Sequence, residues 1–169
     1  MGYSWFQVFN DYKFGTNVVE KFGAFKSNLW LTTEFHLCSG KLPFYKSLLP
    51  KIIRCDNIIS RLYLYRSENL KFEYFTKLTE SGKVKRLEIC ETKIVGSQNA
   101  IVPIEEIFKY ALYASAIMIN PAFLTKQTLK ILNSSKHGCK LGDLSLHGIN
   151  NMLDVDDFLE FKKVVYFNN

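Results

Sequence analysis

The chain has 169 residues, of which 47% are hydrophobic and 15% aromatic, and its formal net charge is +6. This composition is too apolar for a disordered tail and suits a single domain with a sizeable core over residues 1–169. No apolar run reaches the length of a membrane span, and the N-terminus lacks the pattern of a signal peptide, so we expect a soluble intracellular protein.

The first 30 residues are rich in aromatic side chains and fit none of the repeated stretches that follow. Because the terminal units of a stacked array need protection from solvent, we expect residues 1–30 to cap the open end of a sheet. The alternative is an exposed segment that docks a partner, since large exposed apolar patches usually mark interaction sites. The aromatic residues concerned are Tyr3, Trp5, Phe6, Phe9, Tyr12 and Phe14.

From residue 31 to residue 169, short stretches of alternating apolar residues recur. Val84-x-x-Leu87-x-Ile89-x-x-Thr92-x-Ile94 fits the leucine-rich pattern L-x-x-L-x-L-x-x-N/C-x-L, with Thr92 in the Asn/Cys place. Alternation of this kind predicts strands. The residues equivalent to Leu87, which we call the anchor positions, recur every 21 to 30 residues at Phe35, Leu62, Ile117, Leu144 and Val165.

Apolar residues at helical spacing lie between these predicted strands. The first such pattern ends at Gly82, which suits a helix C-terminus, and the next begins at Pro103, which a first helical turn tolerates. Thr125 and Asp154 suit the N-caps of two more helices. The apolar stripes are Phe72, Phe75 and Leu78; Ile104, Ile107, Phe108 and Leu112; Leu129 and Leu132; and Val155, Phe158 and Phe161.

Strands that alternate with helices imply a parallel sheet with the helices on the other side. One strand and one helix cannot bury their apolar sides alone, whereas stacked copies can. We therefore expect an α/β fold, a leucine-rich-repeat-like strand–helix solenoid of about five to six irregular units; a non-repetitive α/β domain is the alternative. The residues expected to share one core are Leu62, Leu64, Leu87, Ile89, Ile117, Ile119, Leu144 and Leu146.

Alternate side chains of a strand face opposite sides of the sheet. The neighbours of the leucines therefore form a face without helix cover, and solenoids bind partners on such faces. These neighbours are Glu34, His36, Cys38, Arg61, Tyr63, Tyr65, Arg86, Glu88, Cys90, Ala116, Met118, Asn120, Asp143, Ser145 and His147. The predicted partner-binding residues are Arg61, Tyr63, Tyr65, Arg86, Glu88, Met118, Ser145 and His147, because Tyr and Arg are favoured binding anchors. The alternatives are a merely solvated face and a face covered by the N-terminal segment.

Patterns that carry catalysis, cofactors or metals were not found. The three histidines are scattered, glycine-rich phosphate loops are missing, and no G-x-S-x-G elbow occurs. Glu105 and Glu106 point in different directions on a helix and fit a first helical turn better than an acid/base pair. The cysteines Cys38, Cys55, Cys90 and Cys139 form no C-x-x-C pair and are expected to be buried, reduced thiols. We expect no enzyme activity, no cofactor and no metal; a small-molecule enzyme with a spatially assembled site is the minor alternative.

The stretch from Ile59 to Phe161 resembles the C-terminal region of the large nematode family of F-box proteins with degenerate leucine-rich repeats. The residues that carry the resemblance are Leu70–Thr79, Val84–Ile89, Ile101–Ile107, Leu144–Ile149 and Asp154–Phe158. In that family an N-terminal F-box docks the adaptor subunit of a cullin ubiquitin ligase, and the C-terminal part captures the protein to be ubiquitinated. A complete F-box is not evident before the repeats, so the resemblance implies substrate capture and leaves adaptor docking without support.

We therefore predict a protein–protein interaction module, either the substrate-recognition part of an F-box-type ubiquitin ligase receptor or a truncated paralogue. The protein partner is unknown, and no membrane partner is expected. The alternative is a basic nucleic-acid-binding module, because a net charge of +6 permits attraction to phosphates. The basic residues are spread through the predicted helices and loops, which argues against that alternative.

Overall fold

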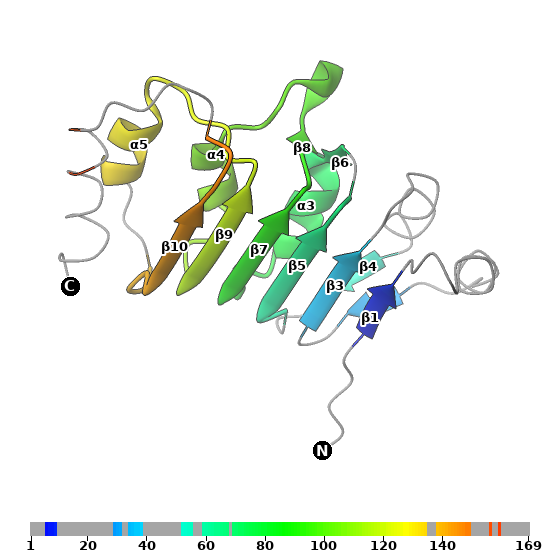
Figure 1. Cartoon of the computed structure of the whole chain (residues 1–169). Coiled ribbons are helices and arrows are strands. Elements are labelled where there is room, and N and C mark those ends of the chain that lie inside the picture. The colour runs from blue at the N-terminus through cyan, green and yellow to red at the C-terminus, as the bar shows by residue number, and fades with distance from the viewer. Residues whose placement is uncertain are drawn as a thin grey trace.

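The computed structural model describes residues 6–9, 29–31, 34–38, 52–55, 59–67, 69–134, 138–149, 156 and 159. Within these residues the protein is an α/β structure built on a six-stranded sheet whose neighbouring strands are all parallel (Figure 1). The strands, in sheet order, are β1 (Phe6–Phe9), β3 (Glu34–Cys38), β5 (Arg61–Tyr65), β7 (Arg86–Cys90), β9 (Ala116–Asn120) and β10 (Asp143–Leu146).

The anchor positions lie side by side across this sheet. Phe35 is the cross-strand partner of Leu62, Leu62 of Leu87, Leu87 of Ile117, and Ile117 of Leu144. The pairing from β3 to β10 shows no register shift, although the connections differ in length. The phase of these strands is therefore confirmed, and it fixes which side chains share each face of the sheet.

A second set of short elements follows the strands of the main sheet. The pair β6 and β8 forms a small parallel sheet of its own, as does the pair β2 and β4. These elements are β2 (Leu29–Leu31), β4 (Ile52–Cys55), β6 (Leu70–Lys71), β8 (Ile94–Val95), the 3₁₀ turn η2 (Ser97–Asn99), and the helices α3 (Phe72–Thr79), α4 (Ile104–Phe108) and α5 (Thr128–Ser134). Figure 1 shows α3 and α4 behind the main sheet.

Helix α3 forms where the sequence predicts it. Phe75 and Leu78 are buried on one side, while Glu73 in the first turn and Lys77 in the last turn match the helix dipole. The helix ends at Thr79, and the turn that follows contains Gly82 at φ +66°, a conformation that glycine adopts without steric cost. The helix therefore stops earlier than expected: Glu80 is the C-cap residue, and Gly82, the predicted C-cap, lies in the following turn.

Helix α4 is shorter than its apolar stripe suggests. It begins after Pro103 and ends at Phe108, where the amides of Tyr110 and Ala111 bond to carbonyls three residues back and tighten the chain into a turn. Leu112 was expected on the helix stripe. It lies beyond the helix with 38% of its surface exposed, so that prediction was wrong, and Ala111 takes the buried place.

The core lies between the main sheet and the helices. The inward residues of β5, β7 and β9 are at most 1% exposed, as predicted, and they pack with buried side chains of α3, α4 and α5. Leu144 and Leu146 were expected in the same core but are only partly buried against it. Their strand β10 is the edge of the six-stranded sheet, so it has a neighbouring strand on one side within the described residues.

The N-terminal segment contributes a strand. Phe6–Phe9, within the residues expected to cap the sheet, form β1 at the other edge of it, parallel to β3. Most of residues 1–30, the helix expected after Asp154 and the strand expected near Val165 lie outside the described residues. Within the part of the chain that the structure describes, no helix is long and apolar enough to cross a bilayer.

Candidate protein-binding face

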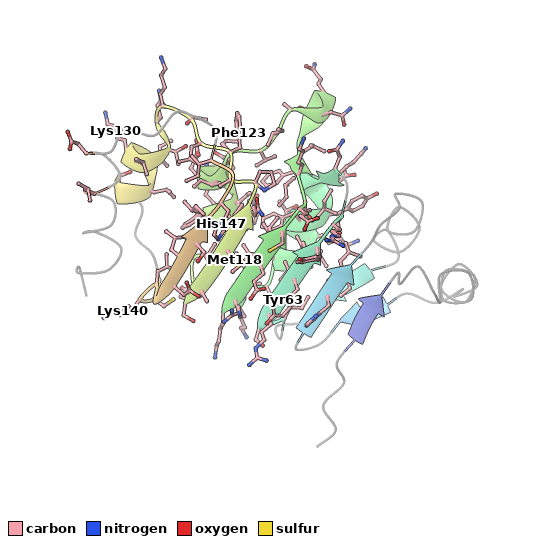
Figure 2. The ribbon with its side chains drawn as sticks, viewed as in Figure 1. Tyr63, Met118, Phe123, Lys130, Lys140 and His147 are labelled. Atoms are coloured by element: carbon pink, nitrogen blue, oxygen red, sulfur yellow. The ribbon has the colours of Figure 1, made fainter. Side chains whose placement is uncertain are left out.

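The side chains that alternate with the core leucines share one face of the main sheet, which we call the open face. All eight predicted partner-binding residues belong to it, and register aligns seven of them in rows across the strands. The rows are Arg61, Arg86, Ala116 and Asp143; His36, Tyr63, Glu88, Met118 and Ser145; and Tyr65, Cys90 and Asn120. His147 follows β10, and Figure 2 shows it on the viewer's side with Tyr63 and Met118.

Aromatic side chains occupy the β3–β5 part of the open face. The rings of His36 and Tyr63 are tilted against each other with their centroids 4.2 Å apart. Tyr65 is 43% exposed, and the guanidinium of Arg66 lies 5.6 Å from the centre of its ring. Arg66 also pairs with Glu91 at 2.9 Å, which holds its charged group near the tyrosine. This part of the open face therefore presents aromatic rings that contact neighbouring side chains: Tyr63 contacts His36, and Tyr65 contacts Arg66.

Arg66 and Glu91 were missed by the sequence analysis because each follows the last residue of a strand. They occupy equivalent places after β5 and β7, and both have a left-handed backbone, with φ of 47° and 50°. The amide of Arg66 donates to the carbonyl of Cys90 at 2.9 Å. The same turn therefore follows both strands, and it places the Arg66–Glu91 ion pair at this border of the open face.

Sulfur and acid groups occupy the centre of the open face. The Sγ atom of Cys90 lies 3.6 Å from the Sδ atom of Met118. Cys90 and Cys139 were expected to be buried, but both are only partly buried. The partial burial of Cys90 raises the pKa of its thiol, and the negative charges of Glu88 and Glu91 raise it further. Cys90 is therefore a poor nucleophile near neutral pH and contributes a polarisable contact surface instead.

The opposite end of the strands is basic. The Nε atom of Arg86 donates to Oε1 of Glu88 at 2.6 Å; this hydrogen bond, and then the charge of Glu88, raise the pKa of Arg86. Arg61 lies beside Arg86 in register, and Lys85 directly precedes β7. These side chains line an open depression of about 520 Å³, which we call the basic hollow; its full lining is Ser60, Arg61, Tyr63, Lys85, Arg86, Ser115 and Ala116.

Comparison of the chain with protein-family models, curated proteins and solved structures found no match.

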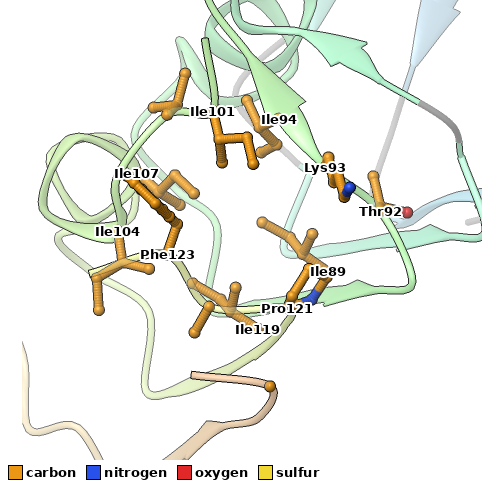
Figure 3. Close-up of a pocket in the computed structure, with 13 residues that line it drawn as sticks. Ile89, Thr92, Lys93, Ile94, Ile101, Ile104, Ile107, Ile119, Pro121 and Phe123 are labelled. Carbon is orange, nitrogen blue, oxygen red and sulfur yellow. The ribbon is translucent and has the colours of Figure 1, made fainter. Parts of the chain in front are cut away.

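A separate cavity lies on the helix side of the sheet (Figure 3). It encloses about 190 Å³, and its walls are largely branched aliphatic side chains from β7, β8, β9 and α4, among them Ile89, Ile94, Ile107 and Ile119. Lys93 and Thr92 are the polar side chains of its lining. The cavity has no convergent set of polar groups of the kind that binds and turns over a substrate.

Within the described residues, no cluster of three or more His, Cys, Asp or Glu side chains could hold a metal ion. Glu105, one of the adjacent acidic pair, is 5% exposed and accepts hydrogen bonds from the hydroxyls of Thr125 at 2.8 Å and Thr128 at 2.6 Å. Its neighbour Glu106 points elsewhere and bonds Lys109 at 2.6 Å. The two carboxylates thus serve different contacts, as expected from their places on α4.

Proposed function

We propose that this protein is a protein–protein interaction module that holds its partner on the open face. One observation carries the proposal. The outward side chains of β3, β5, β7, β9 and β10 are aligned in rows over a face that no described helix covers, while their inward neighbours from Phe35 to Ile119 are buried. Aromatic, arginine and methionine side chains lie in these rows, and such residues are enriched in protein interfaces.

We propose further that the chain is a leucine-rich-repeat-like solenoid. The support is a backbone pattern that recurs at the starts of β7, β9 and β10, each bonded to the residue before the preceding strand. The carbonyl of Ser60 accepts from the amides of Lys85 and Arg86 at 2.8 and 3.0 Å. The carbonyl of Lys85 accepts in the same way from Ser115 and Ala116, and that of Ser115 from Gly142 and Asp143. In a solenoid each repeat contacts the next repeat in the same way, and these hydrogen bonds fit that arrangement.

A pair of buried hydroxyls adds to this support. Thr92 occupies the Asn/Cys place of its repeat, and its Oγ1 accepts from the amide of Ser67 at 3.0 Å and lies 3.3 Å from the carbonyl of Leu64. Ser67 occupies the same place one unit earlier, and its Oγ lies 3.4 Å from the carbonyl of Leu37. Each hydroxyl also lies near a carbonyl of its own strand, that of Cys90 at 3.0 Å for Thr92 and that of Tyr65 at 3.3 Å for Ser67. The two side chains therefore contact the preceding strand at equivalent points and satisfy polar groups that stacking would otherwise bury unpaired.

The family resemblance makes the proposal more specific. We infer that the chain is the substrate-recognition part of an F-box-type ubiquitin ligase receptor, or a truncated paralogue of one, with an unknown protein as its substrate. An intracellular setting agrees with the free thiols of Cys90 and Cys139, since reducing compartments keep cysteines unpaired.

The test is quantitative capture with matched variants. The immobilised protein is incubated with cell extract, and recovered proteins are compared by mass spectrometry between the wild type, Tyr63→Ala and the control Lys130→Ala on α5. A partner that fits the proposal loses recovery with Tyr63→Ala and keeps it with Lys130→Ala, while both variants retain the wild-type melting temperature. Titration of the purified partner must then give a higher Kd for Tyr63→Ala than for the wild type and Lys130→Ala. If no recovered protein depends on Tyr63, the open face is not the binding surface.

A basic nucleic-acid-binding module is the second candidate, because three cationic side chains line the basic hollow. Affinity for nucleic acid driven by phosphate contacts falls steeply with added salt. A salt titration with an oligonucleotide therefore separates this candidate from a protein-binding face that relies on aromatic contacts.

A further inference from the structure

The basic hollow brings like charges together at one end of the open face. Its lining contains Arg61, Lys85 and Arg86 and no carboxylate. Figure 2 shows nitrogen-tipped side chains at the lower ends of β5 and β7, where these strands begin. A depression of about 520 Å³ has room for a carboxylate-bearing side chain together with its hydration water.

The backbone fixes the positions of these cations. Arg61 and Arg86 are direct cross-strand partners, and the amides of Lys85 and Arg86 both donate to the carbonyl of Ser60. Like charges directly opposite each other on neighbouring strands destabilise the pair. The bond from Arg86 to Glu88 offsets part of this repulsion, and the lining of the hollow still carries three cationic side chains that an anion would meet.

Arg86 is held in place before any ligand arrives. Its Nε atom is bonded to Glu88 at 2.6 Å, which orients the plane of the guanidinium and keeps the group charged. The terminal nitrogens of a guanidinium oriented in this way can still donate to a carboxylate in the fork geometry that arginine favours. A preorganised donor loses less entropy on binding than a free side chain does.

The distribution of acid groups limits the class of ligand. Glu88 lies in the central row, and Asp143 lies in the same row as Arg61 and Arg86, on β10. A polyanion laid along the sheet would meet these carboxylates as well as the cations. Glu88 is already bonded to Arg86, so a ligand with one anionic group meets the three cations of the hollow against less opposing charge than a polyanion does. Residues next to that group in a peptide would reach Tyr63 and Met118, which lie on either side of Glu88 in the central row.

We propose that the basic hollow binds a glutamate or aspartate side chain of an acidic peptide segment in the protein partner, with neighbouring apolar residues of that segment lying on Tyr63 and Met118. This proposal rests on the open face being the protein-binding surface, and it adds the chemistry by which the partner is recognised.

The test uses a short fluorescein-labelled peptide with a run of glutamates followed by leucine and tryptophan. Its twin carries glutamine in place of glutamate, and a single-stranded oligonucleotide serves as the polyanion. Binding to the full chain is measured by fluorescence anisotropy at low and moderate salt. We expect the glutamate peptide to bind and the glutamine twin to bind about tenfold more weakly or worse, because a charge-assisted hydrogen bond is lost at the hollow.

Variants that remove or reverse a charge of the hollow locate the site. Lys85→Glu and Arg86→Gln should each raise the Kd of the glutamate peptide about tenfold. Lys130→Glu, on the exposed surface of α5, changes the net charge by the same two units as Lys85→Glu and should leave the Kd within about twofold. Melting temperatures check that each variant folds. Lys85 is exposed, so Lys85→Glu should fold and still tests the site if Arg86→Gln does not fold.

Three results would overturn the proposal: equal binding of both peptides, equal loss with Lys130→Glu, or tighter binding of the oligonucleotide at the same residues. Capture from extract then separates the two proposals. If recovery of the partner depends on Tyr63 and not on Lys85, the hollow is not an acid-binding site, while the open face keeps its function. If recovery depends on neither residue, both proposals fail.

Discussion

Leu87 is the most direct probe of the proposed repeated architecture, and we predict that Leu87→Ala destabilises the protein strongly. The side chain has no exposed surface, and it lies between its cross-strand partners Leu62 and Ile117, which are themselves at most 1% exposed. If the side chain of Leu87 points into the core, the substitution removes carbon atoms that are packed on all sides.

The magnitude follows from what the substitution deletes. Three carbon groups leave an apolar environment at about 0.8 kcal/mol each, which gives about 2.4 kcal/mol of lost transfer free energy. The strands on both sides of β7 are held by in-register pairing and cannot collapse into the space, so a cavity cost is added. We expect a loss of about 3 to 4 kcal/mol in the free energy of unfolding, out of the 5 to 15 kcal/mol that is usual for a domain.

Urea-induced unfolding followed by circular dichroism measures this loss as a lower midpoint at an unchanged slope. The matched control is Leu112→Ala, which makes the same chemical change at a residue that is 38% exposed and should cost about 1 kcal/mol or less. If the two variants lose the same stability, or if Leu87→Ala loses less, the inward phase of β7 is wrong and the repeated architecture with it.

Three further predictions concern the cavity, a buried carboxylate and a thiol. Ala122 lines the apolar cavity of about 190 Å³, so Ala122→Val should raise the free energy of unfolding by about 0.5 to 1 kcal/mol. Ala114, equally buried but not part of that lining, should lose about 1 to 3 kcal/mol on the same change; opposite signs in urea unfolding are the expected result, and matching signs would contradict it. Thr128→Val removes a hydroxyl that donates to the buried Glu105 and should cost about 1 to 3 kcal/mol, whereas an unchanged midpoint would show that this bond contributes nothing. Burial and nearby acids raise the pKa of Cys90, so its thiolate forms at higher pH than that of a free cysteine; iodoacetamide labelling followed by mass spectrometry should give a pH midpoint above that of a model peptide, and a midpoint below it would refute the assigned environment.

The sequence predicted the strands well because a period of two is a strong local signal. The phase of the anchor positions from Phe35 to Leu144 could be set from the alternation alone, and the structure aligns those five residues as neighbours. Helix α3 was also predictable from its apolar stripe, of which Phe75 and Leu78 are buried, although the helix ends before Gly82. At α4 the stripe continued to Leu112 while the chain turned after Phe108, since an apolar residue can follow the period of a helix without belonging to it.

Other features depend on contacts between distant residues and left no local pattern. The strands β6 and β8 have two residues each, which is too short for any periodicity to show. The bonds from Thr125 and Thr128 to Glu105 join residues about 20 positions apart, and the sequence gives no measure of their distance in space. The basic hollow likewise combines Arg61 with Lys85, and Lys85 lies just before a strand, outside the alternation that defined the open face.

Along each strand, alternate side chains have different roles: the inward ones contribute to stability, and the outward ones are available for binding. On β5, Leu62 and Leu64 are buried without any exposed surface, while Tyr63 between them points to the open face. A change at Tyr63 therefore removes contact surface on one side of the sheet and leaves the buried leucines on the other side in place. The side chains of a row differ widely, from tyrosine through glutamate to methionine, because outward positions need only suit the ligand and their immediate neighbours. For this reason a loss of partner binding in Tyr63→Ala at an unchanged melting temperature can be assigned to the face itself, whereas the same loss in Leu87→Ala could not.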